Sequence, residues 1–347
     1  MLDFRSELLD EDKQLPLPSL RIVFLIVGTH GDVLPFLGLC KRLIADGHRV
    51  RLATHAVHRA LVLKHDIEFY PLGGDPRVLC KWAVESGGTV LGELSRVRPA
   101  KLTMLKEICH SLWDACTKPD PYDPAAPAFV AEAIVANPPT FGHIHVAEAL
   151  GCPLHMMFPQ PWTETVAFPH PMSGLTNDNE PGRAYRNWGS YHAVDMSMWL
   201  GNAMMINSWR RNTLHLRPIR TGTLAGNLLT RLHVPFSYMW SPSFVPKPAD
   251  WPYFVDVVGA FTTDQVKSGF DESRFAALST WLSDGAPPIF VRQPERLTPT
   301  PSLDTRGRRR SEEPDRCRSE PGRCQVGAWS KAGRSLGLSS APGSVLC

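Results

Sequence analysis

Residues 22–27 form an unbroken apolar run, rich in β-branched side chains, that ends directly at Gly28. Such a run is typical of a strand covered on both faces, as in the centre of a parallel sheet. The apolar residues that follow recur at the three-to-four spacing of one helix face and stop at Gly47, a common residue at helix C-termini. A strand, a glycine turn and a helix make the first half of a βαβ unit. This junction therefore predicts an α/β fold.

The same alternation continues along the chain. We expect strands at 49–54, 67–72, 133–137 and 153–158, and helices at 56–64, 102–116 and 142–150. Strands that alternate with helices build a parallel sheet with helices on both faces. The predicted fold class is thus a doubly wound, Rossmann-like α/β domain.

The pattern changes after the last of these strands. Residues 160–191 are rich in aromatic residues and proline without periodicity, which predicts a long loop that serves as a lid or pocket wall. Residues 194–216 return to helical spacing, with a broad apolar face that includes Met198 and Trp209. Two interpretations of this face stay open: core packing, or a surface for a lipid or another hydrophobic acceptor.

Composition limits the partners of the chain. It has 37 basic and 34 acidic residues, and 11 of the basic ones lie in residues 292–347, so the remainder is nearly neutral. This balance argues against nucleic acid as a ligand. No apolar run approaches the roughly 20 residues of a membrane-spanning helix, and residues 1–20 lack a signal-peptide pattern, so we expect a cytoplasmic protein. The eight cysteines form no C-x-x-C pair, which predicts reduced thiols and no metal site.

The two ends of the chain differ from its middle. Residues 1–20 are expected to be a flexible extension. Residues 288–291 look like the start of another buried strand, but residues 292–347 contain ten arginines, six prolines and no periodic apolar segment. We expect 292–347 to be disordered, with a composition resembling an out-of-frame translation.

Two side chains that can carry protons follow the first strand, namely His30 and Asp32. Ligands of open parallel sheets bind outside the carboxyl ends of the strands, where both residues are expected to lie. Asp32 is equally suited to capping the helix that follows. The lone pair Gly28 and Gly31 is a weak dinucleotide signal, and no acidic residue ends the second strand, so a nicotinamide enzyme is not expected.

Several longer motifs occur in unbroken order over residues 21–291. They are Gly28-Thr29-His30-Gly31-Asp32-Val33-Leu34-Pro35, Gly73-Gly74-Asp75-Pro76, Ala136-Asn137-Pro138-Pro139, His145-Val146-Ala147-Glu148-Ala149-Leu150, Pro161-Trp162-Thr163-Glu164-Thr165, Phe168-Pro169-His170-Pro171, Tyr238-Met239-Trp240-Ser241-Pro242-Ser243 and Asp256-Val257-Val258-Gly259. Together they resemble the amino-terminal domain of sterol 3-beta-glucosyltransferases, which are UDP-glycosyltransferases of family 28. Fungal sterol and related lipid glucosyltransferases are the group that they resemble most.

This resemblance implies the two-domain GT-B architecture, in which the first domain binds the acceptor and the second binds the UDP-sugar. It implies an inverting transfer of glucose to the hydroxyl of a sterol or similar lipid, with a base that removes the hydroxyl proton. By position that base is Asp32. The family usually has arginine where this chain has His30, and a histidine can itself act as the base, so both residues stay candidates.

The resemblance also implies binding residues and domain limits. Gly28, Thr29 and Gly31 would keep the backbone close to the UDP-glucose or other UDP-sugar co-substrate, and no further cofactor or metal is implied. The residues implied to line the acceptor pocket are Trp162, Thr163, Phe168 and His170. Residues 21–240 correspond to the acceptor domain, and 241–291 to an interdomain linker with the first strand of a donor domain.

The motifs of that donor domain do not follow in this sequence. We therefore expect a chain truncated before the donor domain and inactive by itself. The alternative hypothesis is a non-catalytic half-domain that binds lipid or a full-length paralogue, with peripheral contact to a membrane.

Overall fold

The computed structural model describes residues 18–95, 99–123, 125–177, 179–220, 228–261 and 275–284. The chain divides into two units, Met1–Phe270 and Asp271–Cys347. The described part of the second unit contains one helix, α11 (Ala276–Ser283). Most of the predicted extension at 1–20, the strand predicted at 288–291 and the predicted tail at 292–347 lie outside the described residues.

The first unit is built on a single sheet of seven parallel strands in the order β3-β2-β1-β4-β5-β6-β7. The strands are β1 (Arg21–Leu25), β2 (Arg49–His55), β3 (Glu68–Leu72), β4 (Ala133–Ala136), β5 (Leu154–Phe158), β6 (Phe236–Tyr238) and β7 (Val255–Val257). The chain winds outward from β1 to β3 and then returns to wind outward from β4 to β7. This order confirms the doubly wound α/β prediction. Open α/β sheets usually bind ligands where the strand order reverses, which here is at the carboxyl ends of β1 and β4.

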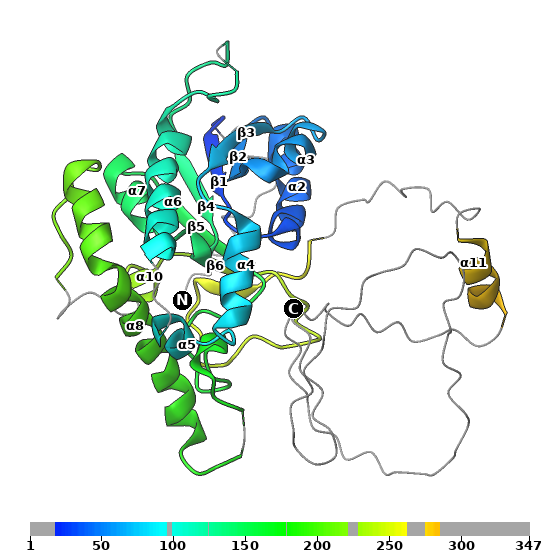
Figure 1. Ribbon diagram of the computed structural model, residues 1–347, viewed down its shortest axis with the longest axis vertical. Helices are drawn as coiled ribbons and strands as arrows, with labels where there is room; N and C mark the ends of the chain where they lie inside the picture. Colours follow the sequence, from blue (N-terminus) through cyan, green and yellow to red (C-terminus); the bar gives the residue numbers. More distant parts are fainter. Residues whose placement is uncertain are drawn as a thin grey trace, which may run out of the picture. The chain divides into compact units, whose positions relative to one another are not determined.

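Helices cover both faces of the sheet (Figure 1). Helices α2 (His30–Ala45) and α3 (Arg59–Leu63) pack on one face, and α6 (Pro99–Thr117), α7 (His143–Leu150) and α8 (Arg183–Asn212) pack on the other. The remaining helices of this unit are α4 (Pro76–Glu85), α5 (Val90–Ser95), α10 (Leu228–Arg231) and the 3-10 turns η2 (Ala56–His58), η3 (Pro138–Thr140) and η4 (Pro171–Ser173).

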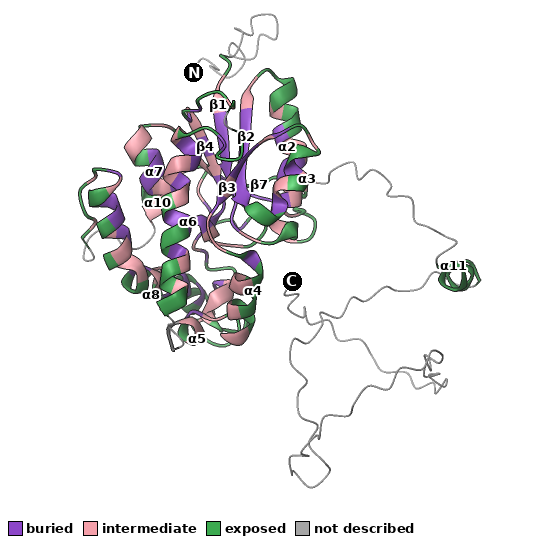
Figure 2. Cartoon of the chain, turned by 45° about the horizontal axis from the view of Figure 1, so that its top comes forward, coloured by how far each residue is buried: buried purple, intermediate pink, exposed green. Residues whose placement is uncertain are grey.

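Strand β1 contributes to both apolar layers of the core. Phe24 packs in the layer that contains α2, whereas Leu25 packs in the layer that contains α6. Successive side chains of a strand point to opposite faces, so a strand covered on both faces must be apolar at every position. This explains why the whole run 22–27 is apolar, and Figure 2 shows the buried interior of the sheet around β1 and β2.

Helix α8 begins at Arg183 rather than at 194, so part of the predicted loop is helical. Tertiary contacts hold this first part of α8 where the sequence has no simple periodicity. The side-chain amide of Asn187 donates to the carbonyl of Val166, and the backbone N–H of His170 donates to the hydroxyl of Ser190. The loop 160–182 therefore packs against the helix that follows it.

The elements of the sheet domain that were not predicted include helices α4, α5 and α10 and strands β6 and β7. Helices α4 and α5 lie between β3 and α6, and the short strands β6 and β7 extend the sheet at its edge. Three-residue strands are too short to show an alternating pattern. Because β7 pairs with β6, part of the range 241–291, predicted as linker, belongs to this sheet.

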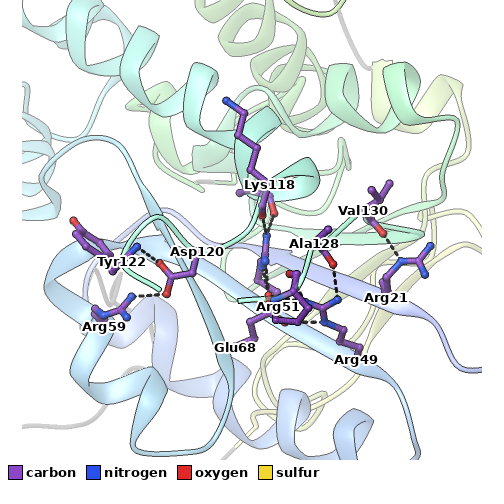
Figure 3. Close-up of polar contacts among 12 residues, drawn as sticks. Arg21, Arg49, Arg51, Arg59, Glu68, Lys118, Asp120, Tyr122, Ala128 and Val130 are labelled. Carbon is purple, nitrogen blue, oxygen red and sulfur yellow. Dashed lines mark hydrogen bonds and ion pairs between the residues drawn. The ribbon is translucent and has the colours of Figure 1, made fainter. Parts of the chain in front are cut away.

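Arginines near the amino ends of β1 and β2 hold the segment that leads from α6 to β4 (Figure 3). The fully buried Arg51 pairs with Glu68 and donates to the carbonyls of Ala115 and Lys118. Its guanidinium also lies 4.0 Å from the centre of the Phe129 ring. These contacts lie at the opposite end of the strands from the predicted site, so they support the fold rather than the chemistry.

Candidate functional site

The turn between β1 and α2 holds Asp32 in a defined position. The backbone N–H of Thr29 donates to Asp32 Oδ2 at 2.6 Å, and the Thr29 hydroxyl donates to the same oxygen at 3.0 Å. Asp32 therefore does help to cap α2, as the structural alternative predicted, although Thr29 is the N-cap residue and Asp32 is the third residue of the helix. Both bonds end on Oδ2, so they leave Oδ1 open to another partner.

Gly28 makes this geometry possible. Its φ is +150°, which side-chain-bearing residues rarely adopt, and a Cβ atom here would lie 2.3 Å from Asp32 Oδ2. Gly31 differs, because a Cβ there would meet nothing nearer than the Thr29 hydroxyl at 3.9 Å. Of the two glycines, only Gly28 is required by the close approach of the backbone to the carboxylate.

The half-buried environment of Asp32 alters its acidity. Burial raises the pKa of this carboxyl above its usual value, while the Thr29 hydrogen bonds and the charge of His58 act in the opposite direction. A carboxylate with a raised pKa accepts a proton more readily than one in water. Asp32 thus combines a raised pKa with a position that caps the helix.

Two histidines lie beside this turn. His30 is the first residue of α2 and is exposed, and its ring centre lies 6.2 Å from that of His58. His58, in η2 after β2, places Nε2 3.2 Å from the carbonyl oxygen of Gly28. Burial lowers the pKa of His58. Sequence reasoning missed His58, although its place just after the second strand was an available signal.

Asn137 joins the carboxyl ends of β1 and β4. Its side-chain Nδ2 donates to the carbonyl of Val27 at 2.8 Å, and its Oδ1 accepts the Val27 N–H at 3.1 Å. The fully buried amide therefore satisfies both backbone groups of the last apolar residue before Gly28. Asn137 belongs to a motif quoted above, but the sequence alone suggested no role for it.

An apolar cavity of about 290 Å³ lies next to the turn. Val27 and Phe158 line it from the sheet, and helices α4, α5, α6 and α8 supply most of the other walls. Its two charged lining residues, Glu93 and Lys101, neutralise each other across 2.7 Å. Such a lining suits an apolar ligand whose few polar groups lie near its ends.

Trp162 is the predicted acceptor residue that lines this cavity. Its backbone N–H donates to the hydroxyl of Tyr238 at 3.0 Å, and its ring packs edge-on against Phe158 and His170, with centres 5.9 and 4.7 Å away. Thr163 also donates to the Tyr238 hydroxyl, but it lines a second cavity of about 160 Å³. The aromatic loop therefore forms part of a pocket wall.

The other two predicted acceptor residues line neither cavity. His170 is buried behind the Trp162 ring, its Nδ1 accepts the N–H of Met172 at 3.0 Å, and burial lowers its pKa to about 4. Phe168 packs against Trp251, with ring centres 6.2 Å apart. Both residues support the loop that carries Trp162.

Two classes of feature are absent from the described residues. They contain no group of three or more His, Cys, Asp or Glu side chains placed to bind a metal ion. None of their helices combines the length and hydropathy needed to cross a membrane.

Comparison with known proteins identifies similar sequences. Residues 22–169 match the Glycosyltransferase family 28 N-terminal domain. Two sterol 3-beta-glucosyltransferases of Arabidopsis thaliana are 44% and 43% identical over 289 and 276 residues. These matches cover 81% and 79% of this chain but 43% and 42% of the plant proteins, so the chain spans less than half their length.

A fungal sterol 3-beta-glucosyltransferase, from Leptosphaeria maculans, is 35% identical over 250 residues, which are 72% of this chain and 16% of the fungal protein. It is less similar than the plant proteins, although the motifs alone pointed to the fungal group. Among solved structures, the glycosyltransferase of kitacinnamycin has a TM-score of 0.45 at 14% identity, with 73% of this chain and 54% of that chain covered.

Proposed function

We propose that this chain is the acceptor-binding part of a UDP-sugar-dependent glucosyltransferase that acts on a sterol or similar lipid, because residues 22–169 match the glycosyltransferase family 28 N-terminal domain. The observation that carries the proposal is the position of Asp32. Its half-buried carboxylate lies in the turn that follows β1, five residues after Val27, which lines an apolar cavity. The names of the plant relatives supply the class of acceptor.

In the proposed reaction Asp32 is the general base. Its carboxylate removes the proton of the acceptor hydroxyl as the hydroxyl oxygen forms a bond to the anomeric carbon of the sugar. The bond between that carbon and UDP breaks at the same time, UDP leaves with the electron pair, and the configuration at the carbon inverts. The raised pKa of Asp32 strengthens it as a base, and the Thr29 hydrogen bonds hold it in place.

The backbone of the turn is proposed to face the UDP-sugar. Thr29 and Gly31 are exposed at the amino end of the 16-residue α2, which is the positive end of its dipole and suits the negative charge of UDP. The relatives extend well beyond the matched region, so we propose that the remaining donor contacts come from a further domain. We accordingly expect that the 347-residue chain binds the acceptor but transfers no glucose by itself.

The test joins residues 1–291 in frame to the carboxyl-terminal half of an Arabidopsis relative and measures glucose transfer to a sterol. Asp32→Asn is expected to lower turnover by about 10²–10⁴ with little change in acceptor affinity. The matched control is Asp46→Asn, because Asp46 lies beyond the other end of α2 in an exposed pair with Arg42. Normal turnover of Asp32→Asn together with a loss in His30→Ala would assign the base to His30 instead.

We also propose that the chain contacts a membrane surface through α8. Five exposed apolar residues recur along this helix at three- to eight-residue steps, and they are Tyr185, Trp188, Met196, Leu200 and Met204. The same helix lines the apolar cavity, so this contact would place the cavity near the source of a lipid acceptor. Replacing Leu200 and Met204 together by serine should abolish flotation with phosphatidylcholine–sterol vesicles, and unchanged flotation would contradict the contact.

A further inference from the structure

The two cavities of the domain are separated by a thin partition. Four residues line both of them, namely Phe141, Trp162, Met198 and Asn202. Val27, which precedes the catalytic turn, lines only the larger cavity. The end of an acceptor that reacts at Asp32 therefore occupies the larger cavity, and the smaller one lies on the far side of the partition.

The volumes of the two cavities indicate that one ligand occupies both of them. Sites for small molecules usually enclose about 300–1,000 Å³. The larger cavity, at about 290 Å³, falls at the lower limit of that range, and the smaller one, at about 160 Å³, falls below it. A fused-ring lipid with a chain attached would need the space of both.

The four partition residues differ in their freedom to move. The backbone N–H of Trp162 donates a hydrogen bond to the Tyr238 hydroxyl, and the Trp162 ring packs edge-on against His170. The Phe141 side chain packs against the buried apolar layer that contains α6. The Asn202 side chain is tied to the carbonyl of Met198 at 2.8 Å.

Met198 is the partition residue whose side chain has no such constraint among the described contacts. It is half-buried on α8, and its unbranched thioether has three rotatable bonds, so it can change shape around a ligand more easily than a ring or a branched side chain. A change in its rotamer alters the width of the passage without moving the backbone.

From this arrangement we propose that Met198 is a specificity-determining gate that admits the alkyl side chain of a sterol acceptor from the larger cavity into the smaller one. The proposal rests on the proposed function and adds a length requirement for the acceptor. The smaller cavity is lined mainly by apolar residues such as Ile206 and Phe236. Two acidic residues, Glu164 and Asp195, also line it, and Glu164 accepts a hydrogen bond from Thr230; the apolar part of the wall suits a hydrocarbon chain.

The test measures binding of two tritium-labelled steroids to the 347-residue chain by equilibrium dialysis. Cholesterol carries the alkyl side chain, and androst-5-en-3β-ol has the same rings and hydroxyl without it. Met198→Phe should weaken cholesterol binding at least about tenfold, the loss expected when about two methylene groups are no longer buried. Binding of the steroid without the side chain should stay within about twofold. The matched control is Leu63→Phe, because Leu63 is 43% exposed on α3 and lines neither cavity.

Met198→Ala gives an independent measure if the phenylalanine variant does not fold. Opening the passage should raise the preference for cholesterol over the shorter steroid by about threefold or more. Equal changes for both steroids in either variant, or no change, would overturn the gate. If neither steroid binds the wild-type chain, the proposed sterol acceptor is refuted and the gate with it, which distinguishes the two failures.

Discussion

Replacing Gly28 by alanine should destabilise the domain and displace Asp32. The new Cβ would lie 2.3 Å from Asp32 Oδ2, so the carboxylate must move and its bonds to Thr29 must lengthen or break. Loss of a helix cap costs about 0.5–2 kcal/mol. A non-glycine residue at this strained φ costs about 1–3 kcal/mol more. We expect a total near 2–4 kcal/mol.

The assay is urea unfolding followed by far-UV circular dichroism, with thermal melting in parallel. For a domain of this size the loss corresponds to a melting temperature lower by roughly 5–15 °C. The matched control is Gly31→Ala, because a Cβ there, on the first turn of α2, meets nothing nearer than the Thr29 hydroxyl at 3.9 Å. Alanine is a better helix residue than glycine, so this control should be neutral or more stable by up to about 1 kcal/mol. We therefore expect Gly28→Ala to lower the free energy of unfolding and Gly31→Ala to leave it unchanged or raise it.

A double substitution separates the two causes. In an Asp32→Ala background the carboxylate is absent but the Cβ atom, 2.8 Å from a Cβ at residue 28, remains, so Gly28→Ala should cost only the backbone strain and this remaining contact. The coupling between the two sites should be about 1–2 kcal/mol. Equal effects of Gly28→Ala and Gly31→Ala, or full additivity with Asp32→Ala, would refute the reasoning.

Three further predictions concern the support of the site. Burial lowers the pKa of His143 and of His170 to about 4. The contribution of these neutral histidines to stability is therefore complete above the unfolded pKa of 6.5 and is lost as the pH falls towards 4. The free energy of unfolding should decline between pH 6.5 and 4, and His170→Asn should make that decline smaller. Arg51→Met should lower the free energy of unfolding in urea by about 3 kcal/mol, because it leaves buried carbonyls without a donor. The control Arg42→Met removes only an exposed ion pair and should change that free energy by less than about 1 kcal/mol. Asn137→Ala leaves the N–H and C=O of Val27, two residues beyond β1, unpaired, so it should lower the free energy of unfolding by about 2–4 kcal/mol and speed amide exchange at Val27; normal exchange there would contradict the role assigned to Asn137.

Much of the fold followed from local patterns. The strands predicted at 49–54, 67–72, 133–137 and 153–158 agree with β2 to β5 to within two residues at each end. Helix α4 was overlooked although Asp75 and Pro76 form a standard helix start, since the Asp75 side chain accepts the N–H of Arg77. By contrast, β6 and β7 leave no readable pattern, because a strand of three residues is defined by its neighbours in the sheet.

The predicted site residues also differ in how far the sequence alone could place them. Gly28 and Asp32 are close in sequence, so their contact is local and the spacing was sufficient to place it. Trp162 and His170 also lie in one loop, yet the sequence could not show that one lines the cavity while the other is buried behind it. That difference depends on α8 and β6, which hold the loop from outside.

The sequence by itself determined the parallel sheet and the position of the candidate base, because an apolar strand followed by glycine and a helix has few other ways to bury its side chains. Only the tertiary structure brought His58 and Asn137 to the end of β1, since their partners lie 30 and 110 residues away. It alone also formed the two cavities, whose walls come from separate helices. Such contacts depend on the order of strands and on helix packing, and no local pattern encodes where distant side chains will meet.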